Sequence, residues 1–262
     1  MIHIGTCGYS RYQPDGDWKA QYADKLQAYA DRYPAVELNR TFYKLPMART
    51  AAKWREEVPE MFDFTVKVWQ AVTHPTSSIT WRKRKEKLSD EEREGFGNLR
   101  PVPVTMAAWE RTMEIVDALR ASVCVVQTPA GFGPTEEHVE NLRAFFSKVD
   151  RHGAAVAWEP RGEWNENLDL VEELCRDLDL IHIVDPFRRD PRTRGGTAYL
   201  RLHGRNQKET DYHYTYGRSE LEELARKVRA LHADHDRVYC MFNNDDMYAN
   251  AVTLQEILAT GE

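Results

Sequence analysis

The sequence predicts an α/β fold of the (β/α)8 TIM-barrel class, and three observations support this prediction. Its 262 residues are close to the roughly 250 of a typical barrel. Short apolar runs rich in β-branched residues alternate with helical patterns along the chain. The segment GTCGYS after the first apolar run is too short for a dinucleotide fingerprint and lacks its third glycine. We therefore expect one barrel domain over residues 1–262 rather than a doubly wound sheet.

Eight strands are predicted in chain order, each a short run of apolar and β-branched residues. They are IHIGTC (2–7), AVELN (35–39), FDFTVKV (62–68), SVCVVQT (122–128), AAVAWE (154–159), LIHIVD (180–185), AYLRLHG (198–204) and RVYCMFN (237–243). Helical periodicity is found between and after them, over residues 18–33, 47–58, 106–120, 135–149, 168–178, 219–235 and 247–260. The order strand, helix, strand is that of a barrel built from βα units.

Two intervals depart from this regular alternation. The segment DPFRRDPRTRGGT, residues 185–197, is too rich in proline, glycine and arginine to make a helix, which predicts a degenerate sixth βα unit. Residues 70–106 form a long insertion between the third strand and its helix. Segments that follow barrel strands lie at the C-terminal mouth of the barrel, so we expect this insertion to cover the mouth.

Composition limits the location and the partners of the protein. No apolar run approaches the roughly 20 residues that span a membrane, and the first residues lack the pattern of a secretory signal. Four cysteines stand far apart without a CxxC pair, which indicates free thiols in a cytoplasmic protein. The net charge of −6 gives no general preference for nucleic acid. The basic segment WRKRKEK, Trp81 to Lys87, is an exception, either a solvated surface or an arm that contacts phosphates.

Strand parity predicts which side chains point into the barrel. Outward residues pack on helices and are apolar, so Leu200 and Leu202 outside leave Arg201 and His203 inside. The same reasoning gives a set of inward polar residues: Glu37, Asn39, Lys67, Gln127, Glu159, Arg201, His203 and Asn243. Burying so many polar groups costs several kcal/mol each unless they are paired. They therefore form either a neutralised ion-pair network or, as we favour for the set, a ligand site.

Six motifs in this order resemble one family. They are GTCGYS, VELNRTFYKLP, FTVKV followed by TH, WEPRGEW, YLRLHG, and FNND followed by ANA. Together, over almost the whole chain, they resemble the domain of unknown function 72 family, which is distantly similar to endonuclease IV-like barrels. The resemblance implies a TIM-like barrel with a positively lined C-terminal cavity, and it implies no established activity. The residues implied in that cavity are Asn39, Tyr43, Lys67, His74, Glu159, Arg161, Trp164, Arg201, His203, Asn243 and Asn244.

The cations of this set indicate an anionic ligand. Lys67, Arg161 and Arg201 suit phosphate or carboxylate, because a guanidinium matches these groups through two hydrogen bonds and lysine adds a point charge. If the protein is a catalyst, Glu159 and His203 are the best acid/base pair, with Lys67 as a third catalytic residue. The function expected first is thus a pocket for an anionic ligand, such as that of a phosphodiester or nucleic-acid hydrolase.

Other functions stay open. A non-catalytic module that binds nucleotides or nucleic acid would use the same residues, with Tyr43 or Trp164 stacking on a base. A glycosidase-like hydrolase would pair Glu159 with Glu37. We expect no metal and no cofactor, because the histidines are too few for a trinuclear zinc site and the cationic side chains already supply positive charge. The substrate, the reaction and the oligomeric state are not predicted.

Overall fold

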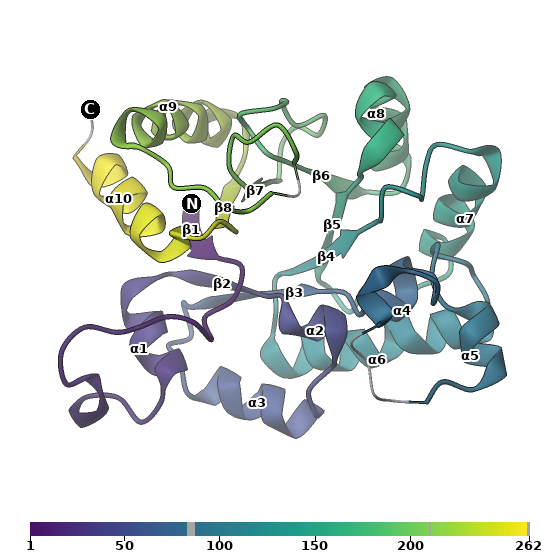
Figure 1. Ribbon diagram of the computed structural model, residues 1–262, viewed down its shortest axis with the longest axis horizontal. Helices are drawn as coiled ribbons and strands as arrows, with labels where there is room; N and C mark the ends of the chain where they lie inside the picture. The colour runs from purple at the N-terminus through teal and green to yellow at the C-terminus, as the bar shows by residue number, and fades with distance from the viewer. Residues whose placement is uncertain (83–86, 210, 261–262) are drawn as a thin grey trace. The chain divides into compact units, whose positions relative to one another are not determined.

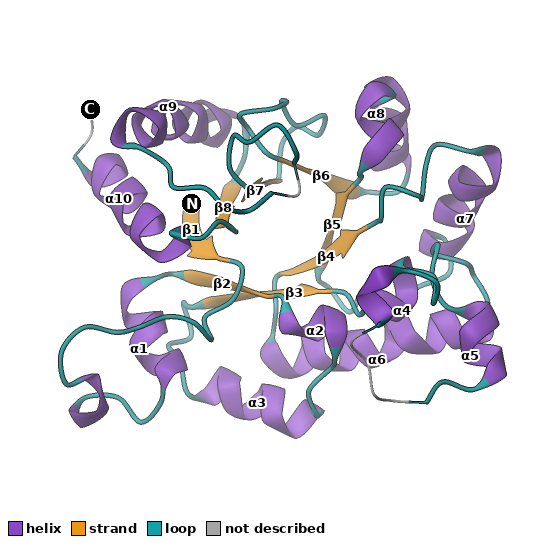
Figure 2. Cartoon of the chain, viewed as in Figure 1, coloured by secondary structure: helices purple, strands orange, loops and turns teal. Residues whose placement is uncertain are grey.

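A computed structural model describes residues 1–82, 87–209 and 211–260 (Figure 1). Eight parallel strands form a closed barrel in the order β1 to β8, which confirms the predicted (β/α)8 fold (Figure 2). Each strand lies within two residues of its predicted bounds. They are β1 (Ile2–Thr6), β2 (Ala35–Leu38), β3 (Asp63–Lys67), β4 (Val123–Gln127), β5 (Ala155–Glu159), β6 (Leu180–Val184), β7 (Thr197–Leu202) and β8 (Arg237–Phe242).

Helices occupy most of the predicted intervals. The α-helices are α1 (Lys25–Arg32), α2 (Arg40–Tyr43), α3 (Ala48–Glu56), α4 (Gln70–Thr73), α5 (Asp90–Gly95), α6 (Pro103–Leu119), α7 (Glu136–Phe146), α8 (Leu168–Asp177), α9 (Arg218–Asp234) and α10 (Met247–Ala259). Three 3-10 helices accompany them: η1 (Trp18–Ala20), η2 (Ile79–Trp81) and η3 (Gly162–Glu166). None of the described helices is both long and apolar enough to span a membrane.

The first predicted helix is shorter than the sequence pattern indicated. Residues 18–33 form η1 and then α1, which begins only at Lys25. The Asp24 carboxylate accepts a hydrogen bond from the Gln27 backbone N–H at 3.0 Å, and such an N-cap fixes where a helix starts. The prediction of one continuous helix here was therefore wrong, because a local capping interaction divides the amphipathic pattern.

The degenerate sixth βα unit is confirmed. Within the described part of the chain, no helix lies between β6 and β7. Arg188 holds this segment instead, since its guanidinium donates hydrogen bonds to the carbonyl oxygens of Gly204 at 3.0 Å and Asn206 at 2.6 Å. An arginine of the loop after β6 thus satisfies backbone carbonyl groups of the loop after β7.

The insertion between β3 and α6 contains α4, η2 and α5 and has its own backbone bonds. Gly97 and Leu99 donate N–H bonds to carbonyl oxygens of α4, at 2.8 Å and 2.9 Å. Gly97 has a φ of +91°, and a Cβ there would meet the Pro75 nitrogen at 2.2 Å, so only glycine fits. The position of this insertion over the barrel mouth stays a prediction.

The chain divides into two compact units, each described by itself. The first comprises Met1–Glu37, Trp54–Phe64 and Ile183–Glu262, and the second comprises Leu38–Lys53 and Thr65–His182. In the first unit, the rings of Tyr199 and Tyr239 stack 5.3 Å apart and are completely buried. In the second, the buried Trp109 ring packs edge-on against Phe145 at 5.5 Å. Aromatic side chains therefore contribute to the core of both units.

Candidate functional site

Lys67 ends β3 in the second unit and is held by two neighbours. Its ammonium donates a hydrogen bond to the Gln127 amide oxygen at 2.8 Å and lies 4.5 Å from the centre of the Phe42 ring. Phe64 and Val66 face the helices and are fully buried, so alternation turns Lys67 to the other face, as predicted. Only 9 % of Lys67 is exposed, which strengthens its attraction to the ring because little water screens the charge.

Glu159 ends β5 and forms an ion pair with Arg161. The Arg161 Nε and Nη2 atoms donate to the same carboxylate oxygen, at 3.0 Å and 2.8 Å. The strand register places Glu159 directly beside Gln127, the hydrogen-bond partner of Lys67. Gly162, with a φ of +70°, makes the turn after Arg161, where a Cβ would meet the Ala130 carbonyl oxygen at 2.8 Å. The sequence thus fixes both members of the pair at the carboxyl end of β5.

His74 lies in the same unit and is uncharged at neutral pH. Its Nδ1 is 2.8 Å from the Thr73 hydroxyl, and its ring meets Phe42 edge-on at 4.8 Å. Burial, and then the positive charges of Lys67 and Arg161, lower the pKa of His74 to about 3. The imidazole can therefore offer a hydrogen bond but not a charge. Because the charges of both Lys67 and Arg161 lower the pKa of His74, the two cations lie close enough to act on the same imidazole.

We call Lys67, His74, Gln127, Glu159 and Arg161 the β3–β5 cluster. Two predicted ligand-binding residues adjoin it through α2. Tyr43 is 52 % exposed and packs edge-on against Phe42, which itself contacts Lys67 and His74. Asn39 is half-buried between β2 and α2. The helix is tied to β3 because the Thr41 hydroxyl donates to the Lys67 carbonyl oxygen at 2.6 Å.

Trp164 is buried in the structure and packs against other aromatic side chains. Its indole is completely buried, its N–H donates to the Phe132 carbonyl oxygen, and its ring lies 5.0 Å from that of Trp158. A ring without exposed surface cannot stack on a ligand unless the fold opens. These contacts favour support of the loop that carries Arg161 over the predicted ligand contact.

Arg201 of the first unit forms a sealed ion pair with Glu37. Arg201 donates from Nε and Nη2 to both carboxylate oxygens, at 3.0 Å and 2.8 Å, and the Tyr199 hydroxyl adds a bond at 3.0 Å. The two side chains are 1 % and 0 % exposed. Burial, and then Glu37, raises the pKa of the neighbouring Cys7 thiol, which keeps it protonated and a poor nucleophile. The geometry favours the ion-pair network that the sequence left open for Arg201.

His203 follows β7, and its backbone is held by Asp185. The His203 N–H donates to Asp185 Oδ2 at 3.3 Å, and the Phe187 N–H donates to Oδ1 at 3.0 Å. Burial raises the pKa of Asp185 to about 6. Ile183 of β6 pairs in register with the inward Tyr199, and alternation then places Asp185, two residues after Ile183, on the same inward face. The catalytic role of His203 stays a prediction.

The two predicted asparagines after β8 differ in their surroundings. Asn244 is 2 % exposed, and its amide donates to the Tyr214 carbonyl oxygen and to Asn250 Oδ1, both at 2.8 Å. Asn243 is half-buried, and its backbone N–H bonds to the Leu202 carbonyl oxygen. Asn244 therefore anchors the loop before α9, whereas ligand binding by Asn243 stays a prediction.

Two further predictions concern metals and the basic segment. Within the described residues, no three histidine, cysteine, aspartate or glutamate side chains form a group that could hold a metal ion. That the protein uses no metal stays a prediction. Of the basic segment Trp81 to Lys87, residues 83–86 lie outside the described residues, so its contact with phosphates is not addressed by the structure.

Comparison with known proteins identifies relatives over the whole chain. The model of the protein family of unknown function DUF72 matches residues 3–261. The UPF0759 protein YunF of Bacillus subtilis is 24% identical, over 98% of this chain and 95% of its own. A DUF72 family protein of Thermotoga maritima has a similar structure, with a TM-score of 0.73, 26% identity and 99% of each chain covered. Endonuclease IV of Thermus thermophilus is more distant, at a TM-score of 0.48, 13% identity, and 87% and 88% coverage.

Proposed function

Because the chain belongs to the DUF72 family, whose description states no function, we propose one from its own residues: the β3–β5 cluster binds a phosphate- or carboxylate-bearing ligand. The cluster lies at the carboxyl ends of β3, β4 and β5, the end of the strands where barrel enzymes place their sites. We also propose a cytoplasmic location, because all four cysteines are free.

The charge balance of the cluster is the observation that carries this proposal. Lys67 and Arg161 are cations, Glu159 is the one carboxylate of the five residues, and the lowered pKa of His74 keeps its ring neutral. Within these five residues the charges sum to +1, in a protein whose net charge is −6, and Lys67 and Glu159 are buried. An anion that accepts bonds from Lys67 and Arg161 would balance this charge, and charged hydrogen bonds of this type are strong.

The cluster also contains groups suited to hydrolysis of a phosphodiester. Glu159 accepts two hydrogen bonds from Arg161, and a carboxylate is a group that can accept a proton from an attacking water. Lys67 and Arg161 would then stabilise the negative charge that develops on the transferred phosphate. His203, predicted as the second acid/base residue, belongs to the first unit, and its role stays a prediction.

A non-catalytic binding module is the second candidate, and Tyr43 favours it. Its ring is 52 % exposed beside the cluster, and an exposed tyrosine is a platform on which a base can stack. A glycosidase is less favoured. Its second carboxylate was to be Glu37, which is fully buried and accepts three hydrogen bonds from Tyr199 and Arg201.

Titration calorimetry with inorganic phosphate tests the proposed anion binding. Lys67→Met and Arg161→Met should each weaken binding about tenfold or more, because a lost charged hydrogen bond is worth roughly 1.5–3 kcal/mol. Arg218→Met is the matched control, since Arg218 is 72 % exposed and pairs with Glu222 on α9. Equal phosphate affinity in all three variants would show that the β3–β5 cluster is not an anion site.

Turnover separates the enzyme from the binding module. With bis(p-nitrophenyl) phosphate as the substrate, Glu159→Gln should abolish hydrolysis and keep phosphate binding, because an amide in place of the carboxylate cannot accept the proton of water. Hydrolysis unchanged by Glu159→Gln would rule out the proposed base. Phosphate binding by a wild type that hydrolyses no phosphodiester would favour the non-catalytic module.

A further inference from the structure

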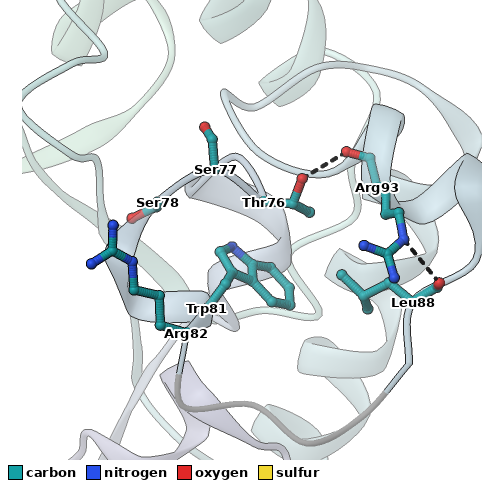
Figure 3. Close-up of a pocket in the computed structure, with 7 residues that line it drawn as sticks. All are labelled: Thr76, Ser77, Ser78, Trp81, Arg82, Leu88 and Arg93. Atoms are coloured by element: carbon teal, nitrogen blue, oxygen red, sulfur yellow. Dashed lines mark hydrogen bonds between the residues drawn. The ribbon is translucent and has the colours of Figure 1, made fainter.

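A cationic pocket, distinct from the β3–β5 cluster, lies in the insertion of the second unit (Figure 3). It has a volume of about 570 Å³. The residues that line it are Thr76, Ser77, Ser78, Trp81, Arg82, Leu88 and Arg93. We call it the insertion pocket. Figure 3 shows the Trp81 ring between the side chains of Arg82 on one side and Arg93 and Leu88 on the other.

The side chains of the insertion pocket select for negative charge. Among the described residues that line it, two carry guanidinium groups, three carry hydroxyls and none is acidic. Elsewhere arginines are neutralised, for instance Arg143 by Glu173 and Asp177. The nearby helix α5 begins with acidic residues, but Glu92 turns back to accept the Ser89 N–H at 2.8 Å and does not line the pocket. Guanidinium and hydroxyl groups donate hydrogen bonds to phosphate oxygens, whereas a carboxylate would repel them.

The floor of the insertion pocket is fixed to the β3–β5 cluster through His74. The Trp81 indole N–H donates to the His74 carbonyl oxygen at 3.0 Å, and the Trp81 ring stacks on Phe96 at 5.7 Å. The imidazole of the same His74 lies within reach of the charges of Lys67 and Arg161. One residue therefore contacts both cationic sites, its carbonyl bound from the pocket and its ring lying in the cluster.

The remaining contacts hold α5 against the pocket. The Thr76 hydroxyl donates to the Arg93 carbonyl oxygen at 2.8 Å, and Arg93 Nε donates to the Leu88 carbonyl oxygen at 3.3 Å. Both bonds are drawn in Figure 3. The first bond fixes the Arg93 backbone and the second orients its guanidinium by one nitrogen, so these lining residues are positioned without a ligand.

We propose that the insertion pocket is a second phosphate subsite and that the two sites together bind a single-stranded nucleic acid. This inference rests on the proposed anion binding by the β3–β5 cluster. A small anion fills one cationic site, whereas this unit has two, with the exposed ring of Tyr43 packed on Phe42 beside the first. A nucleic-acid strand carries phosphates at intervals with flat bases between them, which matches two cationic sites and one exposed ring. A ring of this kind stacks on an unpaired base, so we infer a single strand.

Fluorescence anisotropy with two probes tests the inference. The probes are labelled dTMP, which can fill one site, and a labelled oligothymidylate of about 12 nucleotides, within the usual range of single-strand sites. The double variant Arg82→Glu, Arg93→Glu should bind the oligonucleotide at least tenfold more weakly and bind dTMP as the wild type does. The slope of log affinity against log salt should also become shallower by about 1.4, the value for two lost phosphate contacts on a single strand.

Two further variants complete the design. Arg218→Glu, Arg226→Glu on α9 changes the net charge equally and should leave both affinities unchanged, so it separates a local contact from an effect of overall charge. The neutral variant Arg82→Gln, Arg93→Gln should reproduce the loss in part, and it keeps the test valid if the charge reversal disturbs folding. Circular dichroism checks that each variant is folded.

Each result points to one conclusion. Oligonucleotide binding unaffected by either change at Arg82 and Arg93 would overturn the second subsite, while phosphate binding that depends on Lys67 would still uphold the proposed function. Equal weakening of dTMP and oligonucleotide would make the insertion pocket a site for a small phosphate ester and overturn the nucleic-acid inference. A wild type that binds neither phosphate nor dTMP would contradict the proposed function itself.

Discussion

Two arginine–glutamate ion pairs lie at the carboxyl ends of barrel strands, one in each unit, and they differ in exposure. Arg201 and Glu37 of the first unit are 1 % and 0 % exposed, and Arg201 bonds to both carboxylate oxygens. Arg161 and Glu159 of the second unit are 14 % and 9 % exposed, and Arg161 Nε and Nη2 both donate to Glu159 Oε1. The residue types are the same, but only the second pair has surface that a ligand could contact.

The difference separates two uses of the same chemistry. The buried pair must compensate for desolvation, and the third hydrogen bond, from the Tyr199 hydroxyl, helps to satisfy the Glu37 carboxylate. Arg161 meets one carboxylate oxygen and lies near a second cation, Lys67, whose charge also acts on His74. An inward polar residue is therefore not by itself a binding residue. The two pairs differ in exposure and in the nearby charge of Lys67, and on these two differences we base the proposal that the second pair contacts an anion.

The largest expected effect comes from breaking the buried pair. Arg201→Met should lower the free energy of unfolding by about 3–5 kcal/mol, because it leaves the Glu37 carboxylate buried without its partner. Urea denaturation followed by circular dichroism measures this loss. The double variant Glu37→Gln, Arg201→Met removes both charges and should recover most of it. If the double variant is as unstable as the single one, the loss reflects packing rather than an uncompensated charge.

The second prediction concerns the pH dependence of stability, and it tests His74, which belongs to the same cluster as Glu159 and Arg161. Burial, then Lys67 and Arg161, lowers the pKa of His74 from 6.5 to about 3. Between these values the unfolded chain binds a proton that the folded protein excludes, so stability is present above pH 6.5 and is lost as the pH falls. This residue alone should remove about 2 kcal/mol between about pH 6 and pH 4.

Urea denaturation of the wild type and of His74→Gln across this pH range measures the His74 contribution. Other titrating groups are common to both proteins and cancel in the difference, which should shrink toward acid pH. A difference that does not vary with pH would mean that His74 titrates alike in the folded and unfolded chains. The lowered pKa, and with it the neutral ring assumed in the proposed site, would then be wrong.

The barrel could be predicted from sequence because its strands have strong local signals. Segments such as AVAWE, now β5, are short, apolar and separated by amphipathic helices, and eight repeats of that order admit few folds. The start of α1 was missed because it depends on one capping bond from Asp24 rather than on periodicity. Local sequence patterns thus predict the strands and helices, whereas single tertiary or capping contacts determine the residues at which they begin and end.

The site could be predicted only in part, because parity gives direction and not access. The inward placement of Glu37, Lys67 and Arg201 followed from the apolar residues beside them. That Arg201 is sealed depends on Glu37, which is far from it in the chain and which the Tyr199 hydroxyl also contacts. The insertion pocket had a partial signal, because Trp81 and Arg82 begin the basic segment noted in the sequence. The contribution of Arg93 had none, since η2 and α5 are short elements that only tertiary contacts such as Trp81 on Phe96 bring together.

The smallest expected effect is on the less deeply buried pair, Arg161 and Glu159. Arg161→Met should lower the free energy of unfolding by about 1–2 kcal/mol, less than the loss from Arg201→Met, because the Glu159 carboxylate that remains has some surface that water can solvate. The same urea denaturation measures it, with Glu159→Gln, Arg161→Met as the control. A loss as large as that of Arg201→Met would show that the exposure of the pair makes no energetic difference.

A small loss has a functional consequence, because Arg161→Met would then stay folded, and any weakening of phosphate binding could be assigned to the missing guanidinium itself.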